Sequence, residues 1–185
     1  MVLVNDLKLG MSFVENGDLF KVLDISRNKS ARSQMNIKVK VKNLRSGTLT
    51  EIGYTAGDKV EQAILEKKEM QYLYDDGDSL VFMDTDSYEQ INIQKTRLEW
   101  EMKFLKENDM VTITFFEAEI IGIDLPDKVA LLVTQSEPAV KGDTATSAMK
   151  NAIVETGLEV KVPMFIEEGE TILISTSDGK YSSRA

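Results

Sequence analysis

The sequence predicts an all-β protein with more than one domain. Short stretches alternate apolar and polar residues with the period of two that is typical of strands. A pattern of fourteen residues, "YLYDDGDSLVFMDT", recurs 92 positions later as "MFIEEGETILISTS". The chain of 185 residues is also long enough for two or three small cores.

Six stretches carry the strand prediction. In "NIKVKVKNL" the apolar residues Ile37, Val39 and Val41 alternate with lysines, so one strand face is apolar and the other is a row of ammonium groups. The other five are bounded by Gly, Asp or Asn turns and read "SLVFMD", "VTITFF", "KVALLV", "LEVKVPMF" and "TILIST".

Two segments have helical features. "TRLEWEMKFLKEN" predicts a helix in which Thr96 and Glu99 form a reciprocal cap and one face carries Leu98, Met102 and Leu105. The stretch "GYTAGDKVEQAILEKKEMQYLY" can be read two ways. Asp58 and Glu61 resemble a capping box, and the apolar residues in 58–65 have rough helical spacing, whereas "MQYLY" is strand-like, so a short helix stays an open alternative.

The repeated pattern predicts two hairpins and therefore two related β domains. Gly77 and Gly169 would supply a backbone angle that other residues resist, and the flanking acids would keep each turn in water. The spacing of the acids in "DDGD" does not fit an EF-hand calcium loop, so we expect no metal site there.

Charge is segregated along the chain. Residues 1–64 hold 10 Lys and Arg against 7 Asp and Glu, residues 65–127 hold 6 against 16, and residues 128–185 hold 6 against 8. Pro126, between two apolar runs, supports the second boundary. We therefore expect domains at 1–64, 65–127 and 128–185, with a polyanionic partner contacting only the first.

A basic tract lies in the first domain. Between Ile25 and Thr50 there is no acidic residue, and the tract with its margins carries Arg27, Lys29, Arg32, Lys38, Lys40, Lys42 and Arg45. One reading is a polyanion-binding surface. The other is a solvated strand face whose lysines protect a sheet edge.

Composition excludes several classes of function. The chain has no Cys and no His, which removes thiolate nucleophiles, imidazole bases and most zinc sites. No apolar run approaches the roughly 20 residues of a membrane span. We expect a soluble, cytoplasmic protein that is not an enzyme and needs no cofactor or metal.

The chain resembles the elongation factor P family. The similarity runs through "VNDLKLG", "VKNLRSGT", "MQYLYDDGD", "VFMDTDSYEQ", "EPAVKGDTAT" and "SDGKYSSRA". It is densest in "KNAIVETGLEVKVPMFIEEG", at Lys150, Ala152, Gly157, Val160, Val162, Pro163, Ile166 and Gly169. The resemblance implies three consecutive β-barrels, one SH3-like (KOW-like) and two of OB type, in an L-shaped, tRNA-like arrangement. It also implies a monomeric translation factor that binds the ribosome beside peptidyl-tRNA and relieves stalling on consecutive prolines.

The resemblance assigns a role to the basic tract. The family's loop pattern resembles Lys-Pro-Gly-Lys-Gly, and its second Lys, which is often modified, corresponds to Arg32, whereas Lys29 matches the first. Family branches with Arg at this position imply rhamnose on the guanidinium, added by a glycosyltransferase. The remaining sequence resembles lysine-tipped branches, so the chemistry at Arg32 stays open. Lys29, Arg32 and Lys42 are the expected contacts to peptidyl-tRNA and rRNA.

The last domain has its own candidate residues. "KGDTAT" resembles a family loop that approaches mRNA and the small subunit, which assigns contacts to Gly142, Asp143 and Thr144, although a plain Gly-Asp turn is the alternative. Tyr181 and Arg184 also match family positions and rank lower, because Tyr181 would equally fill a barrel.

Two other classes of function are compatible with parts of the sequence. A general single-stranded nucleic-acid binder would use OB folds, yet it would need aromatic residues on a basic groove, and the middle domain is acidic. A hydrolase with paired carboxylates would use Asp84 and Asp86, or Glu117 and Glu119, each pair on one strand face by alternation.

Overall fold

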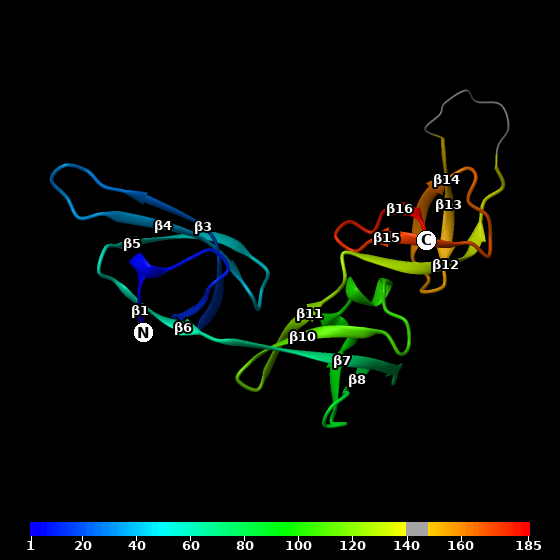
Figure 1. The fold of residues 1–185 in the computed structure, drawn as a ribbon, viewed down its shortest axis with the longest axis horizontal. Coiled ribbons are helices and arrows are strands. Elements are labelled where there is room, and N and C mark those ends of the chain that lie inside the picture. Colours follow the sequence, from blue (N-terminus) through cyan, green and yellow to red (C-terminus); the bar gives the residue numbers. More distant parts are fainter. Residues whose placement is uncertain (140–147) are drawn as a thin grey trace. The chain divides into compact units, whose positions relative to one another are not determined.

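The computed structural model describes residues 1–139 and 148–185 (Figure 1). Regular structure in these residues is β-strand, apart from three single turns of 3₁₀ helix: η1 (Val4–Asp6), η2 (Lys95–Arg97) and η3 (Glu101–Lys103). The all-β prediction is therefore confirmed. Across the described ranges, no helix has the length and apolar character needed to span a bilayer.

The first sheet contains six strands in the order β1-β6-β2-β3-β4-β5. The strands are β1 (Val2–Leu3), β2 (Ser12–Glu15), β3 (Asp18–Asn28), β4 (Asn36–Asn43), β5 (Leu49–Thr55) and β6 (Lys59–Ala63). They curl around a core that includes Val4, Leu7, Phe13, Val22, Ile37, Val39, Val41 and Val60. The β3–β4 hairpin extends well beyond the rest of this sheet (Figure 1).

The second sheet has the order β11-β10-β7-β8-β9. Its strands are β7 (Leu65–Asp75), β8 (Ser79–Asp84), β9 (Gln90–Gln94), β10 (Met110–Phe116) and β11 (Glu119–Asp124). Gly77 in the β7–β8 turn has φ +109° and its N–H donates a 2.8 Å hydrogen bond to the Asp75 carboxylate. The first copy of the sequence repeat is thus the predicted hairpin.

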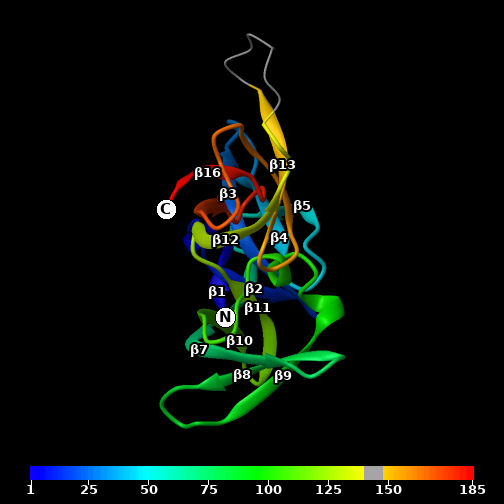
Figure 2. The ribbon, with the colours of Figure 1, turned by 90° about the vertical axis from the view of Figure 1, so that its right-hand side faces the viewer.

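The third sheet has the order β14-β13-β12-β15-β16. Its strands are β12 (Lys128–Ser136), β13 (Met149–Val154), β14 (Glu159–Pro163), β15 (Thr171–Ser175) and β16 (Tyr181–Arg184). Strands β12, β13 and β16 are labelled in Figure 2. The predicted hairpin in the second copy of the repeat is wrong, because β14 pairs with β13 while β15 pairs with β12. Only the turn survives: Gly169 has φ +86° and donates its N–H to the Val133 carbonyl at 2.9 Å.

Contacts between Cα atoms group the chain into two compact units. One contains residues 1–67 and 114–122, so it includes the tip of the β10–β11 hairpin. The other contains residues 68–113 and 123–185. The middle and last sheets therefore contribute most of their residues to one unit.

The helix predicted over "TRLEWEMKFLKEN" is wrong. The segment forms the separate turns η2 and η3, and Leu98 between them has φ −124°, outside the helical range. Neither turn has a side-chain cap. Tertiary contacts decide its shape, because Phe104 is fully buried in the core of the third sheet, among residues such as Leu131 and Ile166. A regular helix would direct only one stripe of side chains to one neighbour.

The open reading over 58–65 is decided in favour of strands. Lys59–Ala63 is β6, and Leu65 begins β7. β6 pairs with both β1 and β2, which takes Val60 into the core opposite Val2. The helical reading is therefore wrong at this position.

Candidate functional site

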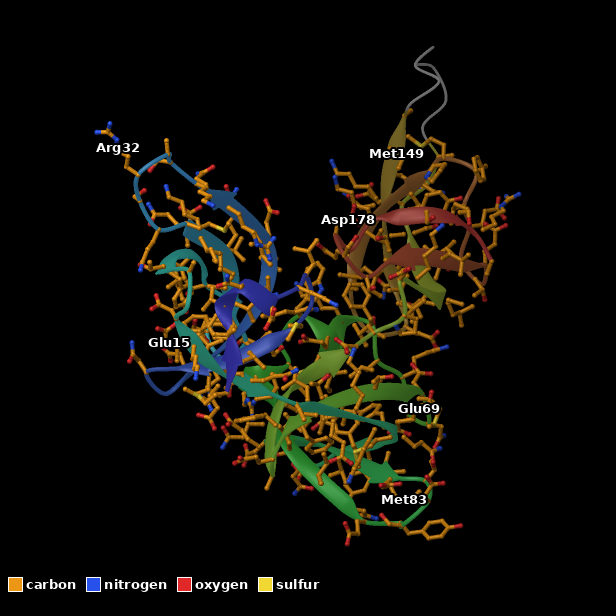
Figure 3. The ribbon with its side chains drawn as sticks, turned by 60° about the vertical axis from the view of Figure 1, so that its left-hand side comes forward. Glu15, Arg32, Glu69, Met83, Met149 and Asp178 are labelled. Atoms are coloured by element: carbon orange, nitrogen blue, oxygen red, sulfur yellow. The ribbon has the colours of Figure 1, made fainter. Side chains whose placement is uncertain are left out.

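The stretch "NKSARSQ" forms the end of the β3–β4 hairpin. The last paired residues are Asn28 and Asn36, so residues 29–35 make the connecting loop. Within the loop the Ser33 N–H donates to the Ser30 carbonyl at 3.3 Å, and the hydroxyls of these two serines share a hydrogen bond. Arg32 lies in this turn, and its side chain points outward from the hairpin tip (Figure 3).

The apolar face of β4 attaches the hairpin to the domain. Ile37, Val39 and Val41 are completely buried, and Ile25 and Met35 pack against the same core. Burial of a branched aliphatic side chain contributes about 1.5 to 3 kcal/mol. The alternation predicted from the sequence thus fixes which face of the hairpin carries its lysines.

Three of the seven cations in the basic tract have protein partners. The Arg27 guanidinium donates to the carbonyl oxygens of Asn5 and Leu7, both at 3.3 Å. The Lys38 ammonium lies 3.8 Å from the Glu51 carboxylate. These two side chains are therefore committed to contacts within the domain.

Arg45 is the third partnered cation. It donates two parallel hydrogen bonds of 2.9 Å to the carboxylate of Glu119 and one of 2.6 Å to the carbonyl of Gly17. The side-chain hydrogen bond to Glu119 raises the pKa of Arg45 further above its usual value. This bidentate pair ties the β10–β11 tip to the first sheet, within one unit.

Lys40 is flanked by two carboxylates. The strand register places it opposite Asp24 on β3 and opposite Glu51 on β5. These are the acids that border the basic tract in the sequence, and the sheet brings them back beside it. The middle of the lysine row is therefore locally balanced, which the linear sequence conceals.

Lys29, Arg32 and Lys42 remain. All three are exposed, and none has a hydrogen bond or an ion pair within residues 1–139 and 148–185. They are the three residues for which the family resemblance implied contact with peptidyl-tRNA and rRNA. A free guanidinium can bind phosphate bidentately or stack on a base, whereas a lysine ammonium acts as a point charge.

Sequence reasoning missed one cation on the same surface. Lys21 is exposed on β3 and lies directly opposite Lys42. The two residues are far apart in the chain, and the bulge between Val22 and Asp24 shifts the register. No signal in the sequence reports such a pairing.

The candidate residues of the last domain differ in whether the structure describes them and in the contacts that they make. Gly142, Asp143 and Thr144 lie outside the described residues. Tyr181 is partly buried and packs on the third core, as its barrel-filling alternative requires. The Arg184 guanidinium lies 4.5 Å from the centre of the Phe165 ring and 3.3 Å from the carboxylate of Glu170.

The paired carboxylates do not form the arrangement that the hydrolase hypothesis needs. Asp86 lies in the turn after β8, where its N–H donates at 2.8 Å to Asp84, and Glu117 lies in the turn after β10. The predicted placement of each pair on one strand face is therefore wrong. The hydrogen bond from Asp86 lowers the pKa of Asp84, and Glu119 is bound to Arg45. One carboxylate of each pair, Asp84 or Glu119, therefore has a structural partner.

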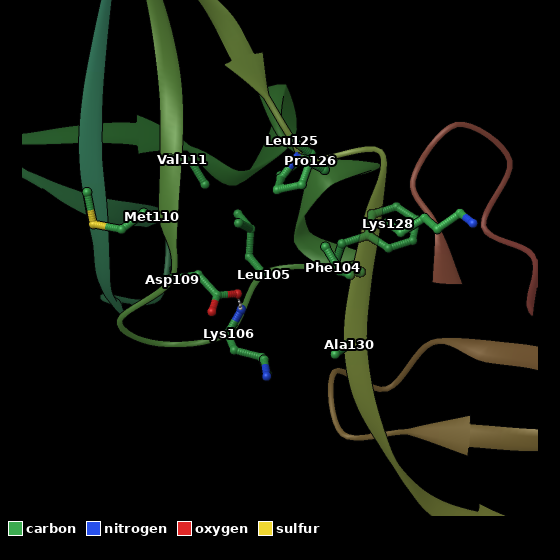
Figure 4. Close-up of a pocket in the computed structure, with 11 residues that line it drawn as sticks. Phe104, Leu105, Lys106, Asp109, Met110, Val111, Leu125, Pro126, Lys128 and Ala130 are labelled. Atoms are coloured by element: carbon green, nitrogen blue, oxygen red, sulfur yellow. Dashed lines mark hydrogen bonds between the residues drawn. The ribbon is translucent and has the colours of Figure 1, made fainter. Parts of the chain in front are cut away.

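A pocket of 290 Å³ opens in the larger unit (Figure 4). Its lining is mainly apolar, from Phe104, Leu105, Met110, Val111, Leu125, Pro126, Val129 and Ala130. Its one acid, Asp109, accepts a 2.9 Å hydrogen bond from the Lys106 N–H, and no hydroxyl or thiol lines it. In the part of the chain described, His, Cys, Asp and Glu form no cluster suited to a metal.

Comparison with protein families defines the class. Residues 3–60 match the elongation factor P KOW-like domain, residues 65–123 the elongation factor P OB domain, and residues 129–184 the elongation factor P C-terminal domain. Three consecutive matches to elongation factor P domains define a translation factor. The fold prediction of an SH3-like (KOW-like) domain followed by further β domains is confirmed.

Curated relatives identify the particular factor. The chain is 54% identical to elongation factor P of Mesoplasma florum over 98% of both chains. It is 50% identical to elongation factor P of Mycoplasma mycoides subsp. mycoides, over 98% of this chain and 99% of the relative. The chain belongs to the elongation factor P family and is a translation elongation factor.

A solved structure supports the fold. The eukaryotic translation initiation factor 5A from Methanococcus jannaschii covers 66% of this chain and 92% of its own, with a TM-score of 0.55 and 22% identity. At that identity the likeness concerns the arrangement of strands alone.

Proposed function

We propose that the protein binds the ribosome beside peptidyl-tRNA and promotes peptide-bond formation at polyproline stalls. It does so by positioning the tRNA end through the loop that carries Arg32. The observation that supports this role most directly is the exposed, unpaired guanidinium at the tip of a hairpin whose other face is buried. The protein acts in the cytoplasm as a monomer with domains at 1–64, 65–127 and 128–185.

The mechanism is orientation without covalent chemistry. Proline is a stiff acceptor and a poor nucleophile, so transfer slows when the peptidyl-tRNA end leaves attack geometry. A contact that holds this end restricts its motion before the reaction, so less entropy is lost on reaching the transition state. Such effects lower the activation free energy by up to about 7 to 11 kcal/mol in ideal cases. The protein then needs no acid, base, cofactor or metal of its own, so it is not an enzyme.

Lys29, Arg32 and Lys42 contact peptidyl-tRNA and rRNA in this proposal. Arg32 makes the directional contact, and the two lysines neutralise phosphate. Binding should therefore weaken steeply as salt rises. In the last domain, Gly142, Asp143 and Thr144 would contact mRNA or the small subunit. Tyr181 and Arg184 are weaker candidates because both already contact the protein.

Arg32 is also the proposed modification site. Its exposed guanidinium is accessible to a modifying enzyme, of which a glycosyltransferase is the type that the family resemblance implies. Intact-mass spectrometry of protein from its native host, followed by peptide mapping of residues 27–38, tests this assignment. An unchanged mass would contradict modification and leave the contact role intact.

Substitution at Arg32 tests the function. In reconstituted translation, Arg32→Ala should reduce synthesis through consecutive prolines while the thermal unfolding of the protein stays unchanged. Arg32→Lys separates charge from guanidinium geometry, and Lys59→Ala, at an exposed lysine on β6, is the control. Normal diproline synthesis with Arg32→Ala would refute the site.

General binding of single-stranded nucleic acid is the less favoured candidate. It predicts tight association with free RNA in gel-shift experiments without ribosomes. The acidic middle domain and the aromatic content of 7% both oppose it. Weak binding to free RNA, together with saturable binding to ribosomes, is the result that we expect.

A further inference from the structure

The outward face of strands β3, β4 and β5 has two regions of different charge. Toward the loop, Lys38 and Lys40 lie beside carboxylates, with Glu51 bound to Lys38 and Asp24 opposite Lys40. Toward the base of the hairpin, Lys21, Lys42 and Leu49 form one row across the three strands. No carboxylate occupies that row.

Lys21 and Lys42 are therefore direct cross-strand neighbours of like charge. Both are exposed, and neither has a hydrogen bond or ion pair to any described residue. Like charges in this position repel each other and destabilise a sheet. A bound anion between the two ammonium groups would reverse the sign of the interaction, because each lysine would then face an opposite charge.

We infer that Lys21 and Lys42 form a second anion-binding position, separate from the loop tip, for the phosphate backbone of RNA. The inference rests on the proposed function and extends it by adding Lys21 and by excluding Lys38 and Lys40. Leu49 completes the row with an apolar side chain that is 68% exposed. It is placed to pack against a ribose or a base beside the bound phosphate.

The spacing favours an extended polyanion. From Asn36, the first residue of β4 after the loop, to Lys42 the strand advances roughly 20 Å, at about 3.3 Å per residue. The charge-balanced region around Lys40 lies between the two cationic positions. A single phosphate group cannot reach both, whereas one RNA backbone can contact the tip and the base together.

The same features argue against an anionic membrane. Peripheral attachment through charge and apolar burial typically uses an amphipathic helix. Here the two lysines lie on adjacent, paired strands, and the row offers one exposed leucine. Membership of a translation factor family also makes RNA the available polyanion.

The test uses the full chain and charge-neutralising variants. Equilibrium binding to purified ribosomes carrying peptidyl-tRNA is measured over a series of salt concentrations for Lys21→Gln, Lys42→Gln and the double variant. Each single variant should bind more weakly and flatten the slope of log K against log salt by about 0.7 to 0.9. Lys59→Gln carries the same charge change outside this face and should keep the parent slope.

A second readout separates binding from folding. Removing one of two like charges should leave the melting temperature equal to or above that of the parent. Diproline synthesis should be restored when Lys21→Gln is supplied at higher concentration, because this variant loses affinity and keeps the Arg32 tip. Binding to vesicles containing anionic lipid should be absent for all forms.

The outcomes distinguish the inference from the proposed function. If Lys21→Gln keeps the salt slope of the parent while Arg32→Ala is still defective in diproline synthesis, the second anion-binding position is refuted. The proposed function would be unaffected by that result. A parent-like slope together with fully active Arg32→Ala overturns both. Vesicle binding that is lost in Lys21→Gln would identify a membrane and overturn the assignment to RNA.

Discussion

The indole N–H of Trp100 donates a 2.9 Å hydrogen bond to the carbonyl oxygen of Thr176, 76 residues away in the chain. The Trp100 ring also packs edge-on against Phe104, with centroids 5.2 Å apart, and the Lys103 ammonium lies 4.9 Å from its centre. The Thr156 hydroxyl donates to the Lys103 carbonyl at 2.6 Å. The segment after β9 is thereby fastened to the last sheet.

Trp100→Phe should destabilise the larger unit by about 1 kcal/mol, since it keeps an aromatic ring but removes the donor to Thr176. Chemical denaturation of the full chain, followed by near-ultraviolet circular dichroism, measures the change. Tyr88→Phe is the control, because that side chain is 73% exposed. Equal stability of the Trp100 variant and the parent would show that the hydrogen bond contributes nothing net.

Phe104→Ala should lower the free energy of unfolding by about 3 to 5 kcal/mol, the range for removing a buried aromatic side chain. Phe104 is completely buried with the last core although it precedes that sheet in sequence. The third sheet should therefore lose stability, which hydrogen exchange at β12 and β15 amides reports. Phe165→Ala is the control at a phenylalanine that is 56% exposed, and it should cost about 1 kcal/mol or less. Unaltered protection in β12 would contradict the role of Phe104.

Gly179→Ala should lower the free energy of unfolding by about 1 to 2 kcal/mol, because the left-handed backbone region is energetically unfavourable for an L-residue with a Cβ atom. Gly179 has φ +72°, and an added Cβ would lie 3.2 Å from the Trp100 ring. Gly53→Ala is a matched control, since Gly53 lies in β5 without a positive φ and a Cβ there meets no atom within 4 Å. The control should be neutral or gain about 0.5 to 1 kcal/mol. A Gly179 variant as stable as the Gly53 variant would rule out both strain and crowding.

Glu15 and Asp75 should give stability profiles of opposite pH dependence. Burial, assisted by the nearby charge of Asp58, raises the pKa of Glu15 above its ordinary 4.5. The hydrogen bond from Lys95, and a second from the Gly77 N–H, lower the pKa of Asp75 below its ordinary 3.8. A raised carboxyl pKa stabilises the fold below the unfolded value, and this contribution is lost as pH rises through the folded value.

Glu15→Gln should accordingly be more stable than the parent at neutral pH, and its advantage should shrink as the pH falls toward 4.5 and below. Asp75→Asn should be less stable than the parent at neutral pH, with the deficit vanishing in acid, where the parent carboxylate is also neutral. Thermal melts of the parent and both variants between pH 3 and 8 measure these differences. Parallel profiles for the two variants would contradict the assigned directions.

Strand positions were predictable where alternation is strong. "NIKVKVKNL" contains β4, because apolar residues at every second position suit a pleated strand with one buried face. "SLVFMD" coincides with β8 for another reason: it is a short continuous apolar run bounded by turn residues, and Leu80, Val81 and Phe82 are all buried. The helix predicted over 96–108 failed because tertiary packing overrides its local periodicity. Phe104 is fully buried in the core of the third sheet, which follows it in the chain, and a local periodicity cannot show which core receives a side chain.

The candidate site divides in the same way. The position of Arg32 in a hairpin loop could be predicted from the sequence. The alternation and the family resemblance both indicate that the two segments flanking the loop pair with each other. Which of the neighbouring cations have acidic or carbonyl partners could not be predicted from the sequence. Arg27 donates hydrogen bonds to the carbonyl oxygens of Asn5 and Leu7. Strand pairing places Asp24 and Glu51 opposite Lys40.

The sequence by itself determined the strand-rich character, the family and the position of the basic loop, because each depends on the order of neighbouring residues. Only the tertiary structure decided which cations are free and that Lys21 faces Lys42. It also decided that Phe104 fills the core of another sheet. Charge balance and burial depend on the atoms that surround a side chain, and in sheets those atoms come from strands distant in the chain.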